Sequence, residues 1–577
     1  MKKFKLTDEE LIKLQNAAED AEKRYNDKLF MLSSVSTATY HSGLNGKTVH
    51  STREAICYAR ALLDLEDDCF LSRAAEIIDV QLKLQDTDPK SPTFGIWSWY
   101  YEEPLDKMDA PDFNWAIFMG IPIIDILDTH SERLDCELKG RMLKAIEFAS
   151  ESIIRRQMGV QYTNITAAEI FTTLKTGRLT DNEKYWLYGR EKLKQFTAFT
   201  YIHGDFFEYN SPTYTSVTAA WLYRLTELLS DDTELFKMAD WLYDLLWKGI
   251  SQVYHYNTAQ WTGAQSRAYF DLLTDEQHTS LSLAVGLSDE FPEHITLSSY
   301  RESFICPDKY KNSFTKQNET IFINKRHFNG ATHPFFMFTQ SHAHMVTPEY
   351  AFGSFNQEEF WNQRRPLNCY FGTRKSPSCF RVRCLHDGYD YSSAQLHTVQ
   401  HKNVTLSQVV FALDRGDTHI SLDLTKNGSI IASDLRLRFE ISGSKDNLSI
   451  EAGEKNVIFH TPYLDIFINI YGSLFGENAA LTVVNESLMT FDVILYSGDE
   501  KTIDFNSLKE AWISFGIGIN NNPTEARVSS DGQHVSSILE YGGHELKVKT
   551  PCRPKKFISL MTQSLHLIDE NPVEQSF

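Results

Sequence analysis

The sequence has few cysteines and lacks long apolar runs. Its eight cysteines are scattered over 577 residues, and none belongs to a Cys-x-x-Cys motif. Free thiols in a reducing compartment are therefore expected, and neither a zinc site nor a disulfide framework is indicated. No run of residues approaches the ~18 apolar positions that a membrane-spanning helix requires. We therefore expect no membrane association.

Basic residues are also the minority among the charged ones. The chain has 57 Lys and Arg against 77 Asp and Glu, a formal net charge of −20 at pH 7. Such a surface repels nucleic acids and anionic membranes, which excludes the wrapping of a polyanion over a broad face. The net charge does not exclude a locally basic pocket that binds one anionic sugar. The N-terminal MKKFKLTDEELIKLQ has no apolar core and no small-residue cleavage site, so we expect a cytoplasmic protein.

Aromatic residues are abundant. They make up 13% of the chain, with 26 Tyr, 37 Phe and 10 Trp. This content is typical of a large aromatic core, and it also fits a cleft in which flat side chains stack on sugar rings. Composition alone leaves both interpretations open.

Helical patterns dominate the first half of the chain. A Thr7-x-x-Glu10 capping box opens the first helix, and further 3.6-residue periods continue to about residue 290. Short connections between them predict antiparallel helix hairpins, a series of which closes into an (α/α) toroid with a concave floor.

Alternating apolar and polar residues replace this pattern within residues 288–318. Segments such as TIFINKRHF and VTLSQVVFALDR, punctuated by Asn-Gly and Asp-Gly turns, predict an antiparallel β-sandwich. The predicted fold class is thus multidomain α+β. We expect a helical (α/α) toroid domain over residues 1–295 and antiparallel β-sandwich domains over residues 296–577.

Four stretches carry candidate functional residues. The first, residues 94–118, places aromatic and polar side chains in a loop rich in Pro and Gly. It is either a loop packed by its own rings or a sugar-stacking wall with hydroxyl-binding polar groups. The candidate substrate-binding residues here are Trp97, Tyr100, Asp112, Asn114 and Trp115.

The second stretch, QYTNITAAEIFTTL, begins a helix. A Thr163 or Asn164 N-cap is one explanation of its polar start. An amide at the start of a helix that faces a cavity also suits a substrate carboxylate, which the positive end of the helix dipole favours.

The third stretch is GDFFEYNSPTYTSVTAAWLYRL, residues 204–225. Asn210 or Ser211 can cap a helix that has Pro212 in its first turn, which leaves Glu208, Tyr209 and Tyr214 unexplained. A tyrosine in the first turn points toward the N-terminal end of its helix. If that end faces a cavity, the phenol is presented to a ligand.

The fourth set lies in two parts of the chain. WTGAQSRAYFDLL offers Arg267 after a helix-breaking glycine, and QSHAHMVTPEY offers His342 and His344 on one face of a strand. The two histidines also fit a metal pair, although no third ligand completes a known spacing. Arg364 and Arg365 are either ion-paired or face an anionic ligand.

These residues and the domain order resemble one superfamily of polysaccharide lyases, which includes the chondroitin AC/hyaluronate lyases and the heparinase II/III–alginate lyases. Asn164 in TNITAAEI is similar to the Asn that neutralises the uronate carboxylate in those enzymes. Tyr214 in EYNSPTY resembles their acid/base Tyr, and Arg267 in GAQSRAY resembles the Arg of their Gly-x-x-Ser-Arg segment. His342 and His344 lie where several relatives bring a His from the β-domain.

The resemblance implies β-elimination on an acidic oligosaccharide or polysaccharide, with no cofactor. Asn164, helped by Arg267 or Asn210, would stabilise charge that develops at the carboxylate. A tyrosine with the usual pKa of about 10 is a poor base at neutral pH, and a nearby cation such as Arg267 lowers that value. Tyr214 would then act as base and acid, or share this work with His342 or His344.

Two other functions stay open at this point. A toroid-type glycoside hydrolase needs two carboxylates, for which Asp112 and Glu208 are candidates and Glu102 or Glu103 are substitutes. A carbohydrate-binding protein without activity is the other, because the sequence has Tyr209-Asn210 where chondroitin-type lyases have a catalytic His. The sugar, the linkage and the oligomeric state are not readable from the sequence.

Overall fold

The structure is a computed structural model that describes residues 6–38, 41–287, 296–302, 304–329, 339–356, 363–414, 425 and 427–568. The chain forms two compact units that interleave along the sequence. Unit 1 comprises Met1–Thr200, Ser216–Leu245 and His278–Ile305, and unit 2 comprises Tyr201–Thr215, Leu246–Gln277 and Cys306–Phe577. The boundary predicted at 295/296 adjoins residues 288–295, which lie outside the described residues, and it stays a prediction.

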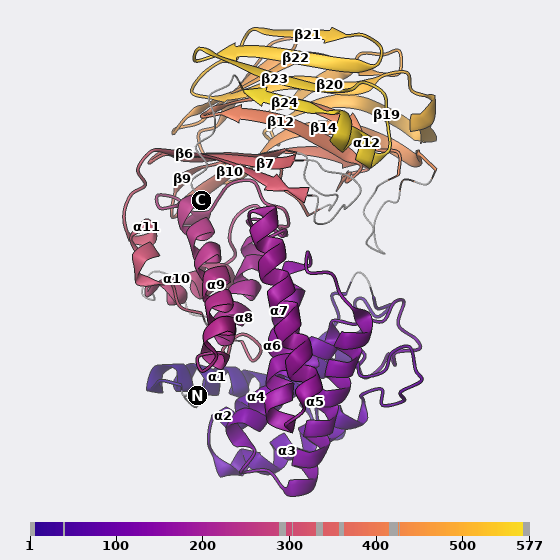
Figure 1. Cartoon of the computed structure of the whole chain (residues 1–577). Helices are drawn as coiled ribbons and strands as arrows, with labels where there is room; N and C mark the ends of the chain where they lie inside the picture. The colour runs from indigo at the N-terminus through magenta and orange to yellow at the C-terminus, as the bar shows by residue number, and fades with distance from the viewer. Residues whose placement is uncertain are drawn as a thin grey trace. The chain divides into compact units, whose positions relative to one another are not determined.

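The first half of the chain is helical, as the periodicity predicts (Figure 1). Its helices are α1 (Asp8–Glu22), α2 (Thr52–Asp64), α3 (Leu71–Lys83), α4 (Trp115–His130), α5 (Cys136–Arg156), α6 (Thr163–Thr180), α7 (Glu183–His203), α8 (Pro212–Leu228), α9 (Thr233–Val253) and α10 (Asp275–Val285). The predicted capping box is present, because the Thr7 hydroxyl accepts from the backbone of Glu10 and the Glu10 carboxylate accepts from that of Thr7. Three short strands, β1 (Tyr25–Asn26), β2 (Met31–Val35) and β3 (Thr48–His50), pair in unit 1.

The helices α4 and α6 lie inside unit 1. Both are buried along nearly their whole length, and α4 packs against α2, α5 and α6. The one buried carboxylate of the α4 interior, Asp125, accepts from Arg60 at 2.7 Å and from Arg224 at 2.5 Å. Two guanidiniums on one buried carboxylate tie neighbouring helices to α4, because breaking such a pair leaves an uncompensated buried charge.

The second half of the chain is built from antiparallel strands, with the short helices α11 (Asn312–Thr315) and α12 (Phe557–Gln563). One nine-stranded sheet contains β6 (Ile321–Phe328), β7 (Thr339–Val346), β8 (Tyr350–Asn356), β9 (Leu367–Thr373), β10 (Ser376–His386), β11 (Tyr389–Asp390), β14 (Ser429–Gly443), β18 (Leu481–Asn485) and β19 (Thr490–Asp504).

Among the described residues, unit 2 contains three further sheets. A six-stranded sheet contains β12 (Ala394–His401), β13 (Val404–Phe411), β15 (Ser449–Ala452), β16 (Asn456–His460), β17 (Asp465–Phe475) and β20 (Ala511–Ile519). A four-stranded sheet contains β21 (Ala526–Ser530), β22 (His534–Tyr541), β23 (His544–Pro551) and β24 (Leu565–Ile568), and β4 (Tyr254–His255) pairs with β5 (Gln260–Trp261).

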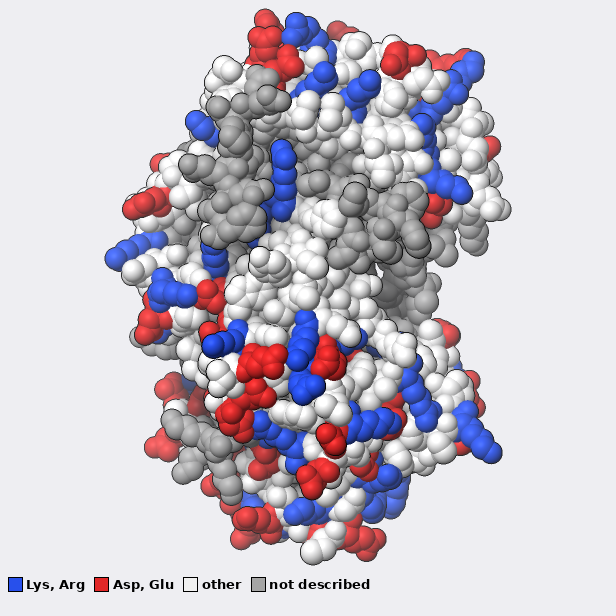
Figure 2. All heavy atoms as spheres, in the orientation of Figure 1, with Lys and Arg blue, Asp and Glu red and all other residues white. Residues whose placement is uncertain are grey.

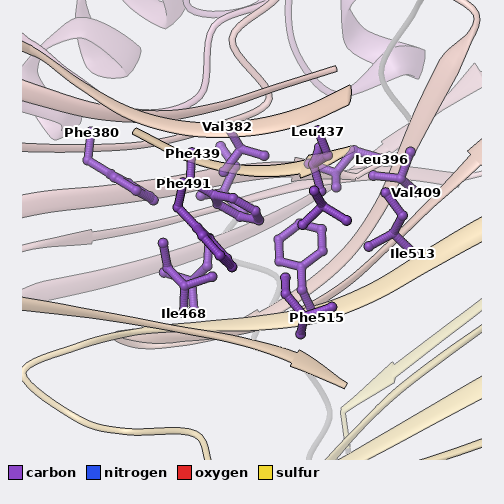
Figure 3. Close-up of a cluster of buried hydrophobic side chains, with 14 of the residues drawn as sticks. Phe380, Val382, Leu396, Val409, Leu437, Phe439, Ile468, Phe491, Ile513 and Phe515 are labelled. Carbon is purple, nitrogen blue, oxygen red and sulfur yellow. The ribbon is translucent and has the colours of Figure 1, made fainter. Parts of the chain in front are cut away.

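The main core of unit 2 lies between the nine- and six-stranded sheets. Phe380, Phe439 and Phe491 from the first sheet meet Ile468 and Phe515 from the second (Figure 3). A smaller apolar cluster, including Leu406 and Val548, joins the six-stranded sheet to the four-stranded one. The six-stranded sheet is therefore covered on both faces.

This middle position explains a feature of β13. Every residue of VTLSQVVF is buried, although the stretch alternates apolar and polar residues at its start. Because successive side chains of a strand point to opposite faces, Val409 enters the main core while Leu406 enters the second one. The predicted fold class is confirmed: helix hairpins of the (α/α) toroid type precede an antiparallel β-sandwich. Its third layer was not predicted.

The length of the helices and the charge of the surface bear on membrane and polyanion binding. Among the described residues, no helix combines the length and the apolar character that spanning a membrane requires. On the face shown in Figure 2, Lys and Arg side chains are interspersed with Asp and Glu side chains. The described residues form no broad basic surface on that face.

Candidate functional site

Several of the candidate residues come together in unit 2, around the segment that links α7 to α8. The helix α7 ends at His203, and Gly204 follows with a positive φ of 93°. Residues 205–211 then lead into α8, which begins at Pro212 as the sequence predicts. Ser211 acts as the predicted cap, since its hydroxyl oxygen accepts from the Tyr214 N–H at 3.2 Å. The same hydroxyl donates to the backbone oxygen of Arg267 at 2.5 Å, which joins the two sequence-distant motifs.

The first group of side chains is a tyrosine–arginine cluster formed by Glu208, Tyr214, Arg267, Tyr269 and Gln363. Each nitrogen of the Arg267 side chain has a partner. Its Nη1 donates to Glu208 Oε1 at 2.5 Å, its Nη2 to the Tyr214 phenol oxygen at 2.7 Å, and its Nε to Gln363 Oε1 at 3.0 Å. The Tyr214 phenol also contacts the Tyr269 phenol. The sequence-predicted pair of Tyr214 and Arg267 is therefore brought together.

Burial makes this arrangement rigid. Glu208 and Arg267 are only 7% and 5% exposed, whereas Tyr214 is half-buried and Tyr269 is exposed. Three directional bonds fix the planar guanidinium, which leaves it little freedom to turn. Its Nη2 donor stabilises negative charge on the Tyr214 oxygen when the phenol loses its proton. The cluster can therefore hold a tyrosine as a proton acceptor and donor at the edge of the unit.

Asn210 was predicted to bind substrate, but its side chain makes its hydrogen bonds within the protein. Its Nδ2 donates to the backbone oxygens of Thr262 and Ala264, both at 2.8 Å, and its Oδ1 accepts from Trp261 Nε1 at 2.6 Å. Its backbone φ is positive, 44°, which asparagine tolerates better than most residues. The amide holds the segment that precedes Arg267, and this is why a polar residue is required at that position.

The second group is a histidine cluster formed by His203, Tyr209, His327, His342 and His344. As predicted, His342 and His344 share one face of β7. The Tyr209 phenol lies 2.6 Å from His344 Nε2, and the Tyr209 ring stacks on the His342 ring with centroids 3.9 Å apart. His327 Nε2 lies 2.6 Å from His342 Nδ1, and His203 stacks on His327. The histidines are thus gathered around Tyr209.

Two glycines make the space that the His344 ring occupies. Gly353 is its partner on β8, and a Cβ there would lie 2.5 Å from His344 Nδ1. A Cβ on Gly263, whose φ is 89°, would lie 2.1 Å from His344 Cε1. Any larger residue at either position would displace the imidazole. The glycine of the WTGAQ motif therefore has a packing role in addition to its turn.

Burial keeps the histidines neutral. It lowers the pKa of His344 to about 3, and it lowers the pKa values of His327 and His342 well below their ordinary range. The pKa of His203 is also lowered by burial. His342 and His344 are 4% and 2% exposed. They were predicted to share the acid/base work, but their surroundings suit a positioning role, in which the hydrogen bond between His344 and Tyr209 fixes the 205–211 segment.

The histidine cluster predicts an acid-sensitive unit 2. A histidine that is neutral when folded takes up a proton on unfolding at any pH below its unfolded pKa of about 6.5. The unfolded state then binds more protons, so the free energy of unfolding falls as the pH drops from about 6.5 toward the lowered folded values. Each such histidine contributes a slope of up to about 1.4 kcal/mol per pH unit. Urea unfolding followed from pH about 7.5 to about 5 measures this slope.

The matched comparison uses His344→Gln and His460→Gln. His460 lies on the same unit, but Asp465 raises its pKa, so it cannot add to the acid loss. His344→Gln is expected to make the fall of the unfolding free energy with decreasing pH shallower. His460→Gln is expected to leave that fall in place. A wild-type unfolding free energy that stays level down to pH about 5 would contradict the prediction.

Asn164 and the aromatic loop belong to unit 1. The helix α6 begins at Thr163 with Tyr162 at the N-cap position, so the predicted cap at Thr163 or Asn164 is wrong by one or two residues. Asn164 lies in the first helical turn and is 3% exposed. Its predicted role at a carboxylate stays a prediction.

The aromatic loop divides into core and surface residues. Trp97 was predicted to stack on a sugar, but it is fully buried and its indole N–H donates to the backbone of Gln81. Tyr100 is half-buried and accepts from Ser36 at 3.2 Å. Trp115 packs against Trp99 with ring centroids 5.1 Å apart and the ring planes tilted by 30°, and both rings are partly exposed.

The polar residues of the loop contact one another. Asp112 accepts from Trp99 Nε1 at 3.2 Å and from the Asn114 N–H at 2.9 Å. Asn114 Oδ1 accepts from Arg156 at 2.6 Å. Glu102 and Glu103, the substitute candidates for hydrolysis, also have hydrogen-bond partners. Glu102 is bonded to His50, and Glu103 accepts from the backbone N–H of Gly43.

Arg364 and Arg365, the two arginines of the β-region, bind partners within unit 2. Arg365 makes an ion pair with Asp271 at 3.4 Å, and its backbone pairs with Gln265. Arg364 donates to the backbone oxygen of Ala394. Ion pairing is thus the outcome for Arg365. No group of three or more His, Cys, Asp or Glu suited to a metal ion occurs in the part of the chain that the structure describes.

Sequence reasoning missed several members of these clusters. His327 lies within a predicted strand, and its place beside His342 follows from the pairing of β6 with β7, which sets Lys325 opposite His342. Gln363 reaches Arg267 because the Gln265–Arg365 bridge brings their segments together. No local pattern signals either contact.

Comparisons with known proteins give a domain family and a set of solved structures. The family profile described as "Domain of unknown function (DUF8769)" matches residues 18–289. Among curated protein sequences, nothing matches the chain. The similar solved structures include heparinase III and, from Streptomyces coelicolor A3, chondroitin AC lyase in complex with chondroitin sulphate.

The similarity to heparinase III has 10% identity and a TM-score of 0.46, with 95% of this chain and 91% of the other covered. The similarity to the chondroitin AC lyase has 10% identity and a TM-score of 0.48, with 94% of this chain and 89% of the other covered. Both carry names that occur in the superfamily which the sequence motifs resemble. Identities and TM-scores this low assign no role to any side chain.

Proposed function

We propose that this protein is a lyase that cleaves uronate-containing oligosaccharides or polysaccharides by β-elimination. The observation that carries the proposal is the tyrosine–arginine cluster. A half-buried phenol, that of Tyr214, receives a hydrogen bond from a buried guanidinium that is held by Glu208 and Gln363. Such a phenol suits the transfer of a proton without a metal or cofactor.

In the proposed reaction, Tyr214 as phenolate removes the proton from C5, next to the uronate carboxylate. The C5–H electron pair moves toward the carboxylate, giving an enolate-like intermediate. These electrons then form the C4=C5 double bond while the C4–O bond breaks, and the leaving oxygen takes the proton from Tyr214. Arg267 stabilises the phenolate at the start of the cycle and again at its end.

The hydrolase alternative has less support from these contacts. Glu208 is buried and bonded to Arg267 at 2.5 Å, and Asp112 already accepts two hydrogen bonds. A general acid for glycoside hydrolysis must hold a proton at the leaving oxygen, and a carboxylate in an ion pair is held in its charged form. Glu208, one of the two candidate carboxylates, is therefore poorly suited to act as that acid.

The test is incubation with a panel of uronate-containing oligosaccharides. Elimination leaves a double bond conjugated to the carboxylate, which absorbs in the far ultraviolet, so rising absorbance is the expected result. New reducing ends without this absorbance would establish hydrolysis instead. Binding without any cleavage would establish a carbohydrate-binding protein.

A further inference from the structure

A pocket enters the main core of unit 2 through a gap in the nine-stranded sheet. The strand β10 pairs with β9 as far as Arg381, opposite Asn368, and with β11 from Leu385, opposite Asp390. Among the described residues, Val382–Cys384 have no strand partner on this side of β10, whereas β14 pairs with its other side throughout. We call the space at this interruption the gap pocket. It contains about 420 Å³ free of protein atoms, part of which is open to solvent.

The inner walls of the gap pocket are apolar. Val382 and Leu437 come from the nine-stranded sheet, and Leu396 and Val409 come from the six-stranded one. All four are buried members of the main core, where Leu396, Val409 and Leu437 lie close together (Figure 3). Protein cores are normally packed without spaces larger than a water molecule, and side chains that line an unfilled space lose contacts. An apolar group of a ligand would restore these contacts.

The charged residues that line the gap pocket are partly exposed. They are two guanidiniums, Arg364 and Arg383, and one carboxylate, Asp390. Asp390 accepts from Arg383 Nε at 2.9 Å and from its Nη2 at 2.7 Å, so these two charges match each other. The three groups together carry one more positive than negative charge. The solvent end of the gap pocket therefore favours an anionic group.

Arg364 is held in place beside the gap pocket. Its Nη2 donates to the backbone oxygen of Ala394, which is another lining residue. The next residue, Arg365, is also fixed, because its backbone pairs with that of Gln265. A guanidinium in a fixed position offers a planar fork that suits a carboxylate, and it loses little freedom when a ligand binds.

We propose that the gap pocket binds a small carboxylate with an apolar body, such as a short branched acid or a single-ring acid. The body enters between Leu396, Val409 and Leu437, and the carboxylate binds Arg364. A sugar acid is excluded, because its hydroxyls would lose water against apolar walls. The site does not depend on the proposed function, since no member of the tyrosine–arginine cluster lines it.

The experiment is isothermal titration calorimetry of the full-length chain with benzoate and isovalerate. Benzamide and isovaleramide keep the apolar body and lose the charge, whereas acetate keeps the charge and lacks the body. Glucuronate presents the same carboxylate on a sugar. We expect one of the two acids to bind about tenfold or more tightly than its amide, acetate and glucuronate, because each of these lacks one interaction.

Two substitutions locate the bound acid. We expect Arg364→Gln to weaken binding about tenfold or more, and Arg527→Gln, which removes the same charge from an exposed site of unit 2, to change it less than about twofold. Ala394→Leu fills the gap pocket but keeps the backbone oxygen that Arg364 uses, so binding should be lost. Circular dichroism and the unfolding temperature show whether each variant is folded.

The amides separate the charge interaction from a general change in the protein. Arg364→Gln should leave the binding of benzamide and isovaleramide unchanged. Equal effects of the two glutamine variants, undiminished binding to folded Ala394→Leu, or no binding of either acid at millimolar concentration would overturn the site. Glucuronate binding as tightly as the acids would overturn the ligand class. If Ala394→Leu does not fold, the two glutamine variants and the amides decide. None of these results changes the ultraviolet assay, which tests the proposed lyase separately.

Discussion

Replacing Tyr214 with phenylalanine is expected to lower kcat for unsaturated product by about 10²- to 10⁴-fold, the contribution of one positioned acid/base group. The substitution removes only the hydroxyl that Arg267 holds at 2.7 Å, and the half-buried ring can stay in place. Binding of an acidic oligosaccharide should therefore change little. Initial rates from the ultraviolet assay, with binding measured separately, separate the two effects.

Two other tyrosines serve as comparisons for this loss. Tyr269→Phe removes the exposed phenol beside Tyr214 and leaves the Arg267 bond in place, so we expect a loss of less than about tenfold. Tyr209→Phe removes the phenol bonded to His344 within the histidine cluster. If Tyr209→Phe abolished turnover while Tyr214→Phe retained it, the acid/base role would move to the Tyr209–His344 pair.

The second large effect is on stability and concerns the ion pair of Arg267 with Glu208. Both side chains are more than nine-tenths buried, so removing either charge leaves the other uncompensated. Glu208→Gln and Arg267→Gln are each expected to lower the free energy of unfolding by about 3–5 kcal/mol. The double variant should lose less than the sum of the two, because it leaves no isolated charge.

The matched control is an exposed ion pair of the same unit, Arg527 with Glu540 at 3.0 Å. Arg527→Gln should cost less than about 1 kcal/mol, because water already solvates both groups. Urea unfolding of all four variants gives the comparison. Strictly additive losses from the two buried single variants would show that Arg267 and Glu208 do not stabilise each other.

The local pattern of the sequence determined much of the secondary structure. The Thr7 capping box, the start of α8 at Pro212 and the strand that places His342 and His344 on one face all follow from neighbouring residues. Backbone periodicity and capping are local effects, so they are readable from local sequence. The third sheet layer was not readable, because burial on both faces of β13 depends on strands more than 100 residues away.

The tertiary structure decided what each polar residue of the site does. Glu208 and Asn210 have the side chains expected of ligand-binding groups, yet one neutralises Arg267 and the other holds backbone oxygens of residues 262–264. Trp97 and Trp115 come from the same aromatic stretch of the sequence, but only Trp115 is partly exposed. The use of a donor or acceptor depends on which partner the fold brings within bonding distance. Those partners come from segments up to 135 residues apart in the chain, the separation of Tyr209 and His344.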